Sequence, residues 1–192
     1  MDIVLAYGRK GLRAALPDGA EATVVEPAYE QALADPLGAL REALRRPLEG
    51  PPLRELARGA GKVGVVFTDI TRPTPNHLIL PAVLEELAAA GVKDERITLF
   101  NATGTHRLNT GEELEGMLGA QVCARYRIVQ NDARAEGAHV LLGSTPLGNE
   151  VWVLREFVEC DLKVLTGFIE PHFVAGFSGG GKVIVPGLAR MD

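Results

Sequence analysis

The sequence predicts an α/β protein with a Rossmann-like, mostly parallel sheet flanked by helices and an antiparallel β appendage at the N-terminus. Two observations predict the sheet. Residues 63–67 form a continuous apolar run, which is typical of a strand buried on both faces of a parallel sheet. Strand and helix patterns then alternate between residues 62 and 118, which favours right-handed crossovers. Turn signals between short strand patterns before residue 26 predict the appendage.

The composition is that of a globular protein with no nucleic-acid or membrane partner. With 192 residues the chain can bury one core, or form one domain with an appendage. The net charge of -5 comes without a clustered Lys/Arg face, which argues against a nucleic-acid partner. The start of the chain lacks a signal-peptide pattern, and no apolar run approaches the length of a membrane span. Cys123 and Cys160 lack metal-ligand spacing, so we expect reduced cysteines in a cytoplasmic protein.

Residues 1–25 are expected to form an antiparallel meander. Residues 3–7 and 22–25 have the composition of strands, and glycine-containing turn signals lie between them. Residues 26–192 are expected to hold the α/β part, so that residues 1–192 form one domain.

Helix signals follow the appendage at four places. Asp35 and Pro36 suit the N-cap and the first position of a helix whose leucines continue at helical spacing. Apolar residues between positions 80 and 87 indicate another helix, in which Pro81 marks the first turn or a restart. Shorter helices are predicted over residues 53–58 and 112–118.

The remaining strand patterns are short apolar runs. Residues 139–142 and 151–154 indicate a pair of strands around a Pro-Leu-Gly-Asn turn. The other runs lie at residues 97–100, 126–129, 162–165 and 183–185.

Polar side chains follow three of the predicted strands at the point where each strand ends. Asp69, Thr71 and Arg72 follow the first of these strands, His106 follows the second, and residues 171–182 follow the third. Ligands of open α/β sheets sit beyond the carboxyl ends of the strands, so these groups are expected to converge on one site if the strands are neighbours. The alternative is a structural role for each group, such as a helix cap or a surface ion pair. His77 and His139 are assigned such structural roles.

The stretch 171–182 is rich in glycine, which permits tight turns and a close approach of the backbone to a ligand. Residues 176–182 match G-x-x-x-x-G-K, but Val183 stands where a P-loop needs Ser or Thr to hold magnesium. Strand patterns on both sides of the loop also disagree with a strand–loop–helix unit. The alternative to a binding site is a surface turn in which Lys182 is solvated and His172 packs on Phe173.

The expected site holds a limited set of reactive groups. His106 and His172 can act as an acid/base pair on opposite faces of a substrate. Arg72 offers a planar fork to a carboxylate, and Lys182 offers a covalent anchor or a charged clamp. No serine or cysteine nucleophile has an evident base, and no carboxylate cluster indicates magnesium.

Three motifs make the chain similar to the nickel-pincer-nucleotide lactate racemase family. The family's marks are Asp-x-Thr-Arg-Pro-x-Pro, Ala-Thr-Gly-x-His-Arg and His-Phe-x-Ala-Gly-Phe-Ser-Gly-Gly-x-Lys, which stand at residues 69–75, 102–107 and 172–182. The resemblance spans nearly the whole chain, but only the N-terminal domain of the family protein. It implies an isomerase, a racemase or epimerase with a small 2-hydroxy acid as substrate. It also implies a C-terminal domain of the same full-length protein as partner.

The resemblance further implies how the cofactor is held. Lys182 corresponds to the lysine that tethers the nickel pincer nucleotide (nickel pyridinium-3,5-bisthiocarboxylic acid mononucleotide). The segment that binds this cofactor corresponds to Asp69, Ile70, Thr71 and Arg72.

The catalytic groups implied by the resemblance are His106 and His172, which correspond to the two acid/base histidines. In the family mechanism one histidine removes the hydroxyl proton while hydride passes from the substrate carbon to the pincer ring. The planar 2-keto acid then takes hydride back on either face, and a histidine returns the proton. Arg72 corresponds to a residue that faces the substrate carboxylate.

The chain departs from the family pattern in two respects. The family's nickel-ligating histidine is expected beyond Asp192, so no residue is assigned as a metal ligand. The C-terminal domain and its substrate contacts are also absent, so the isolated domain is predicted to be inactive. Two other functions stay open: a non-catalytic nucleotide- or phosphate-binding module that uses the glycine-rich loop, and a degenerate homologue that keeps the fold for partner binding.

Overall fold

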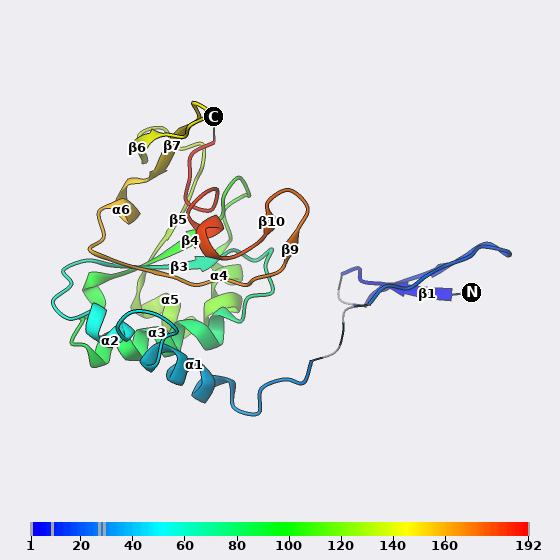
Figure 1. The fold of residues 1–192 in the computed structure, drawn as a ribbon, viewed down its shortest axis with the longest axis horizontal. Helices are drawn as coiled ribbons and strands as arrows, with labels where there is room; N and C mark the ends of the chain where they lie inside the picture. The colour runs from blue at the N-terminus through cyan, green and yellow to red at the C-terminus, as the bar shows by residue number, and fades with distance from the viewer. Residues whose placement is uncertain (1, 9, 27, 29, 192) are drawn as a thin grey trace. The chain divides into compact units, whose positions relative to one another are not determined.

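Figure 1 shows the computed structural model of the chain, which describes residues 2–8, 10–26, 28 and 30–191. Contacts within the chain divide it into two compact units, Met1–Leu33 and Ala34–Asp192. The first unit is an antiparallel hairpin, and the second is an α/β fold built on a parallel sheet. The predicted fold class is therefore confirmed. The grouping of residues 1–192 into one functional domain stays a prediction.

The N-terminal hairpin differs from the expected meander in its second strand. β1 (Asp2–Leu5) pairs antiparallel with β2 (Leu12–Ala15), whereas the expected strand at residues 22–25 is wrong, because these residues lie outside any strand. Gly8 and Gly11 both have positive φ, 53° and 72°, and turn the chain back directly after β1. A short loop costs less closure entropy than a long one, so the residues next to this turn become the partner of β1.

The second unit is built on a parallel sheet with the strand order β5-β4-β3-β8. The strands are β3 (Val63–Thr68), β4 (Ile97–Ala102), β5 (Arg127–Gln130) and β8 (Leu162–Leu165). Every residue of β3 is buried, which agrees with a strand that is covered on both faces. Because β4 and β8 flank β3, the carboxyl ends of these three strands lie next to one another.

The helices agree with the sequence patterns except at Pro81. Asp35 caps α1 (Pro36–Arg45) by accepting a hydrogen bond from the amide of Gly38 (2.9 Å). Pro81 lies inside α3 (Asn76–Ala89), so its placement in the first turn or at a restart was wrong. The helix begins earlier because the side-chain amide of Asn76 donates to the last carbonyl of β3 (3.1 Å). The other helices are α2 (Leu53–Leu56), η1 (Asp94–Arg96), α4 (Gly111–Leu118), α5 (Ala120–Arg125) and α6 (Arg155–Val158).

No helix in the described part of the chain is long and apolar enough to cross a membrane.

One buried ion cluster holds three of the helices together. The Glu86 side chain on α3 is fully buried and accepts from Arg45 of α1 (2.8 Å) and from Arg54 of α2 (2.9 Å). Both carboxylate oxygens are used, since the two arginines bind different ones. The cluster therefore fixes α1 and α2 against α3.

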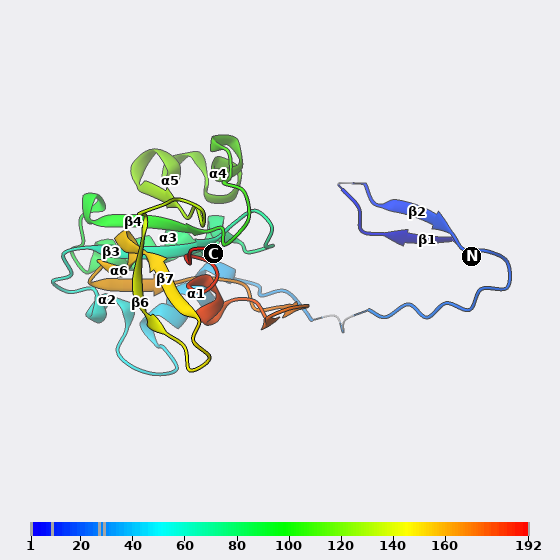
Figure 2. The same cartoon turned by 90° about the horizontal axis from the view of Figure 1, so that it is seen from above.

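Two antiparallel hairpins and a short 3₁₀ turn complete the second unit. β6 (His139–Ser144) pairs with β7 (Glu150–Leu154), as predicted, and both views show them side by side (Figures 1 and 2). β9 (Pro171–His172) and β10 (Gly176–Phe177) form a smaller hairpin in the glycine-rich stretch.

The strand expected at residues 183–185 is wrong, because the chain forms the 3₁₀ helix η2 (Gly180–Val183) there. The amides of Ile184 and Val185 both donate to the carbonyl of Gly181 (3.0 and 3.1 Å), so they are engaged in a turn. Val183 and Ile184 are apolar because they pack against the protein and not because they form a strand. The Val183 side chain, for example, is buried in a hydrophobic core. A four-residue 3₁₀ turn is also not the α-helix that follows a P-loop.

Two hydrophobic cores cover the two faces of the sheet, because successive side chains of a strand point to opposite faces. Val65 and Phe67 pack in the first core, which the helices α1 to α5 complete. Val66 packs in the second core with Phe157 of α6 and Val183 of η2. Figure 1 shows α1, α3 and α5 on one side of the sheet and the β6–β7 hairpin and α6 on the other. The glycine-rich stretch thus belongs to the second face.

Candidate active site

A cavity of about 350 Å³ lies at the carboxyl ends of β3, β4 and β8, which is a size common for small-molecule sites. The end of β3 contributes Thr68, Asp69 and Arg72, and the segment after β4 contributes His106. The β9–β10 hairpin and η2 supply further lining residues. The polar side chains there are His172, Ser178 and Lys182. Groups that are distant in sequence meet here because the sheet places their strands next to one another.

Five of the seven residues singled out as site candidates line this cavity, namely Asp69, Arg72, His106, His172 and Lys182. Ile70 and Thr71 lie in the same segment but outside the lining of the cavity. Ile70 is 45% exposed.

The two histidines that were assigned structural roles lie elsewhere. His77 is exposed on α3, whereas His139 is buried. Nε2 of His139 contacts the side-chain oxygen of Asn131 at 2.8 Å, and burial lowers the pKa of His139. Neither residue lines the cavity.

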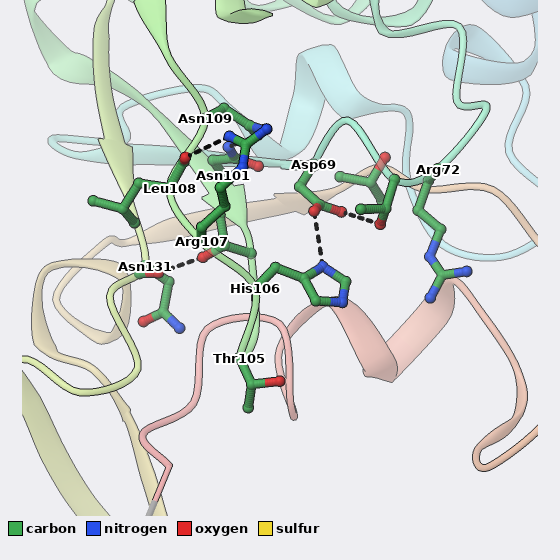
Figure 3. A network of polar contacts seen from close by, with 12 residues as sticks. Asp69, Arg72, Asn101, Thr105, His106, Arg107, Leu108, Asn109 and Asn131 are labelled. Carbon is green, nitrogen blue, oxygen red and sulfur yellow. Dashed lines mark hydrogen bonds and ion pairs between the residues drawn. The ribbon is translucent and has the colours of Figure 1, made fainter. Parts of the chain in front are cut away.

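Asp69 and His106 form a hydrogen-bonded pair at one wall of the cavity (Figure 3). Nδ1 of His106 lies 2.8 Å from Oδ2 of Asp69, and the hydroxyl of Thr71 donates to Oδ1 of Asp69, also at 2.8 Å. The Asp69 side chain is 5% exposed and the His106 side chain 47% exposed. The carboxylate is therefore fixed inside the protein, while the imidazole reaches out of it.

His172 also lines the cavity, and the β9–β10 hairpin holds its ring. Nδ1 accepts hydrogen bonds from the amides of Val174 and Ala175, both at 3.2 Å. Desolvation lowers the pKa of His172, and the positive charges of Lys182 and Arg72 lower it further. The imidazole is thus kept in its neutral form to a lower pH than a free histidine.

Lys182 projects from η2 into the same cavity. Burial lowers the pKa of its amine, and the charge of Arg72 lowers it further. An amine with a lowered pKa is more often unprotonated and is a better nucleophile. Gly179 permits this path of the chain, because its φ is 76° and a Cβ there would come within 3.2 Å of the carbonyl oxygen of Phe168.

Two contributors to the site were missed by sequence reasoning. Glu170 accepts from Arg72 (3.1 Å), and both side chains are mostly buried. Ser178 joins the two sides of the hairpin base: its amide donates to the carbonyl of Glu170 (2.9 Å), and its hydroxyl oxygen accepts from the amide of Glu170 (3.1 Å). Ser178 lies in the stretch 171–182 and Glu170 directly before it. Their side-chain contacts cannot be predicted from residue spacing.

Among the described residues, no group of three or more His, Cys, Asp or Glu side chains gathers in a way that could hold a metal ion. The cavity is lined by two imidazoles, a guanidinium, an amine and the carboxylate of Asp69, and Glu170 pairs with the guanidinium. These groups can bind an anion and move protons.

Comparison with known protein families matches residues 7–192 to the lactate racemase N-terminal domain. Lactate racemase of Lactiplantibacillus plantarum is 37% identical over 150 residues, which cover 78% of this chain and 35% of that protein. Lactate racemase of Thermoanaerobacterium thermosaccharolyticum is 36% identical over 153 residues, covering 80% of this chain and 36% of that protein. The chain thus spans about a third of the length of these relatives.

Solved structures show the same similarity in three dimensions. The lactate racemase apoprotein from Thermoanaerobacterium thermosaccharolyticum matches with a TM-score of 0.83 and 32% identity, over 99% of this chain and 44% of that chain. A protein from Thermotoga maritima matches with a TM-score of 0.66 and 27% identity, over 85% of this chain and 40% of that one.

Proposed function

Because this chain belongs to the lactate racemase N-terminal domain family, we propose that it is the cofactor-anchoring part of a racemase or epimerase that acts on 2-hydroxy acids of the lactate type. The observation that carries the proposal is the meeting of His106, His172, Arg72 and Lys182 in one cavity. Moving a proton on and off a hydroxyl group requires such bases, and a carboxylate substrate requires a cation. The chain spans about a third of its relatives, so we assign the complete reaction to this chain together with a C-terminal domain.

We further propose that the cavity receives a nickel pincer nucleotide. The residues fit such a group, because Lys182 lines the cavity and the lowered pKa of its amine favours a covalent attachment. Asp69 and Arg72 would hold the cofactor from the end of β3. Ile70 and Thr71 belong to the same cofactor-binding segment. The hydroxyl of Thr71 donates to Asp69 and would hold that carboxylate in place. When bound, the cofactor supplies an acceptor and a donor of hydride for the carbon that bears the hydroxyl group.

The proton steps fall to the two histidines in this proposal. His106 and His172 both line the cavity and come from different segments of the chain, so each can reach a bound hydroxyl oxygen. The guanidinium of Arg72 orients the substrate carboxylate, and Glu170 keeps that guanidinium in place. Two bases would serve two enantiomers, since the hydroxyl group points in a different direction in each.

Intact-mass spectrometry tests the attachment. The chain is produced together with the enzymes that make the cofactor, and a covalent adduct is expected on the wild type. The adduct is lost in Lys182→Ala and kept in Lys62→Ala, because Lys62 is an exposed lysine before β3, at the other end of the strand. An unmodified wild type that binds ATP in calorimetry would instead favour the non-catalytic nucleotide-binding module.

The chain alone is expected to be inactive, since the proposed substrate contacts of a C-terminal domain are absent from it. Polarimetry of D- or L-lactate with the cofactor-loaded chain checks this, and measurable racemisation would contradict it. The cytoplasmic location expected from the cysteines also stays a prediction; Cys123 and Cys160 are both free.

A further inference from the structure

The hydrogen-bond partners of His106 determine where its proton sits. A carboxylate can only accept hydrogen bonds, so Nδ1 of His106 must carry the hydrogen that binds Oδ2 of Asp69 (2.8 Å). Oδ1 of the same carboxylate is already engaged by the hydroxyl of Thr71 (2.8 Å). The neutral ring of His106 therefore keeps its lone pair on Nε2, the nitrogen that is free to accept a proton.

The partners of His172 impose the opposite arrangement. Backbone amides can only donate, so Nδ1 of His172 must carry the lone pair that accepts from Val174 and Ala175 (3.2 Å each). The neutral ring then holds its hydrogen on Nε2. Protonation at Nδ1 would set a third N–H against these two donors.

The charges around each ring support the same division. The carboxylate of Asp69 lies 2.8 Å from the ring of His106. Near His172, the charges of Lys182 and Arg72 oppose an imidazolium, and the carboxylate of Glu170 acts in the other direction. The hydrogen-bonded neighbour of His106 is thus an anion, whereas the charges near His172 are mainly cations.

We propose that the two histidines are held in opposite tautomers, so that His106 is the proton acceptor of the resting site and His172 is a hydrogen-bond donor to the bound ligand. Asp69 is the positioning residue for His106, and the amides of Val174 and Ala175 position His172. The catalytic meaning of this inference rests on the proposed function, but the tautomers themselves do not.

The proton step follows from this assignment. The O–H bond of the substrate breaks and an N–H bond forms at Nε2 of His106, which leaves an imidazolium paired with the carboxylate of Asp69. His172 can act as a base only after Nδ1 releases the amides of Val174 and Ala175. Two enantiomers have equal free energy in water, so kcat/KM must be the same in both directions. The asymmetry therefore appears as a difference between the enantiomers in kcat that is matched by a difference in KM of the same factor and the same direction.

Nitrogen NMR of the histidine rings tests the proposal on the chain itself. The sequence has only four histidines, so His→Gln variants assign every ring in long-range ¹H–¹⁵N spectra of ¹⁵N-histidine-labelled protein. At a pH where the rings are neutral, we expect the hydrogen on Nδ1 in His106 and on Nε2 in His172. The same tautomer in both rings, or the reverse assignment, overturns the proposal without any variant.

Two substitutions identify the positioning group. Asp69→Ala should shift His106 toward the Nε2–H tautomer and leave His172 unchanged. Thr71→Val is the matched control, because it keeps the carboxylate and removes only one hydrogen bond to it. The buried His139 reports on folding in both variants, since its ring contacts Asn131 away from the cavity. A folded Asp69→Ala variant with an unchanged His106 ring contradicts the role of Asp69.

The outcome separates this inference from the proposed function. If the Lys182 adduct is absent but the tautomers are as expected, the function fails and the arrangement of the rings stands. If the adduct forms and the tautomers are equal, the function stands and the division between the two histidines fails.

Discussion

The molecule contains two clusters of charged groups, and they are built in opposite ways. At Glu86, one fully buried carboxylate meets two arginines that bind its two oxygens. In the cavity, Arg72 pairs with Glu170 and His106 with Asp69, whereas Lys182 forms no ion pair with any described residue. Both oxygens of the first anion are thus paired with cations, whereas the second cluster keeps one cation unpaired.

This difference separates a structural cluster from a binding site. A buried ion pair whose groups are all satisfied stabilises one arrangement of helices, and its loss leaves an unpaired buried charge. A cluster that keeps an unpaired cation lowers the pKa of the basic groups around it and attracts an anion such as a carboxylate or a phosphate. The two clusters should therefore respond in opposite directions when their cations are removed.

The largest effect is expected from the Glu86 cluster. The double variant Arg45→Ala/Arg54→Ala leaves the buried carboxylate without partners and should lower the free energy of unfolding by about 3 kcal/mol. Urea unfolding followed by circular dichroism measures it. Arg46→Ala is the control, because Arg46 pairs with Glu42 on the exposed side of α1 and should cost less than about 0.5 kcal/mol. Equal losses in the two variants would show that Glu86 is not a structural centre.

A smaller effect of opposite sign is expected in the cavity. Burial and the charge of Arg72 both disfavour the protonated amine of Lys182. Lys182→Met removes this charge, so it should raise the free energy of unfolding at pH 7 by no more than about 1 kcal/mol. The folded-state pKa of Lys182 is below its unfolded value, so the unfolded chain binds more protons between the two values. The gain should therefore shrink as pH rises through this window toward 10.5. A variant that is less stable than the wild type at pH 7 would remove the contrast between the two clusters.

The smallest expected effect is a change in the pKa of His172. The pKa of His172 is lowered below 6.5, by desolvation first and by the charge of Lys182 next, so Lys182→Met should raise it toward 6.5. Because the folded chain binds fewer protons here, stability falls as pH drops from 6.5 through the folded-state pKa. The pH dependence of the His172 ring resonances measures both points. An identical titration curve in the variant would mean that the two side chains do not interact.

The sheet and the grouping of the site could be predicted from the sequence, because both depend on patterns along single strands. The run at residues 63–67 is apolar throughout because β3 is covered on both faces. His106 and His172 could be placed near each other because β4 and β8 flank β3. The second strand of the N-terminal hairpin was expected at residues 22–25, but the residues next to the turn after β1 pair with it instead, because the shorter loop costs less closure entropy.

What the sequence could not reveal were relations between side chains. The Arg72–Glu170 pair joins residues 98 positions apart, and the pattern around either residue is the same with or without it. The turn at η2 was taken for a strand because an apolar side chain such as Val183 is buried in either conformation. The tautomers of the two histidines likewise depend on which donors and acceptors the fold brings within reach.

The two histidines also differ in how far along the chain their partners lie. The ring of His106 is oriented by Asp69, 37 positions away, whereas the ring of His172 is oriented by amides two and three positions away. His106 is therefore prepared only when the sheet is assembled, and its tautomer reports on tertiary structure. The ring of His172 is oriented within a single short loop, so its tautomer reports only on the local structure of the β9–β10 hairpin.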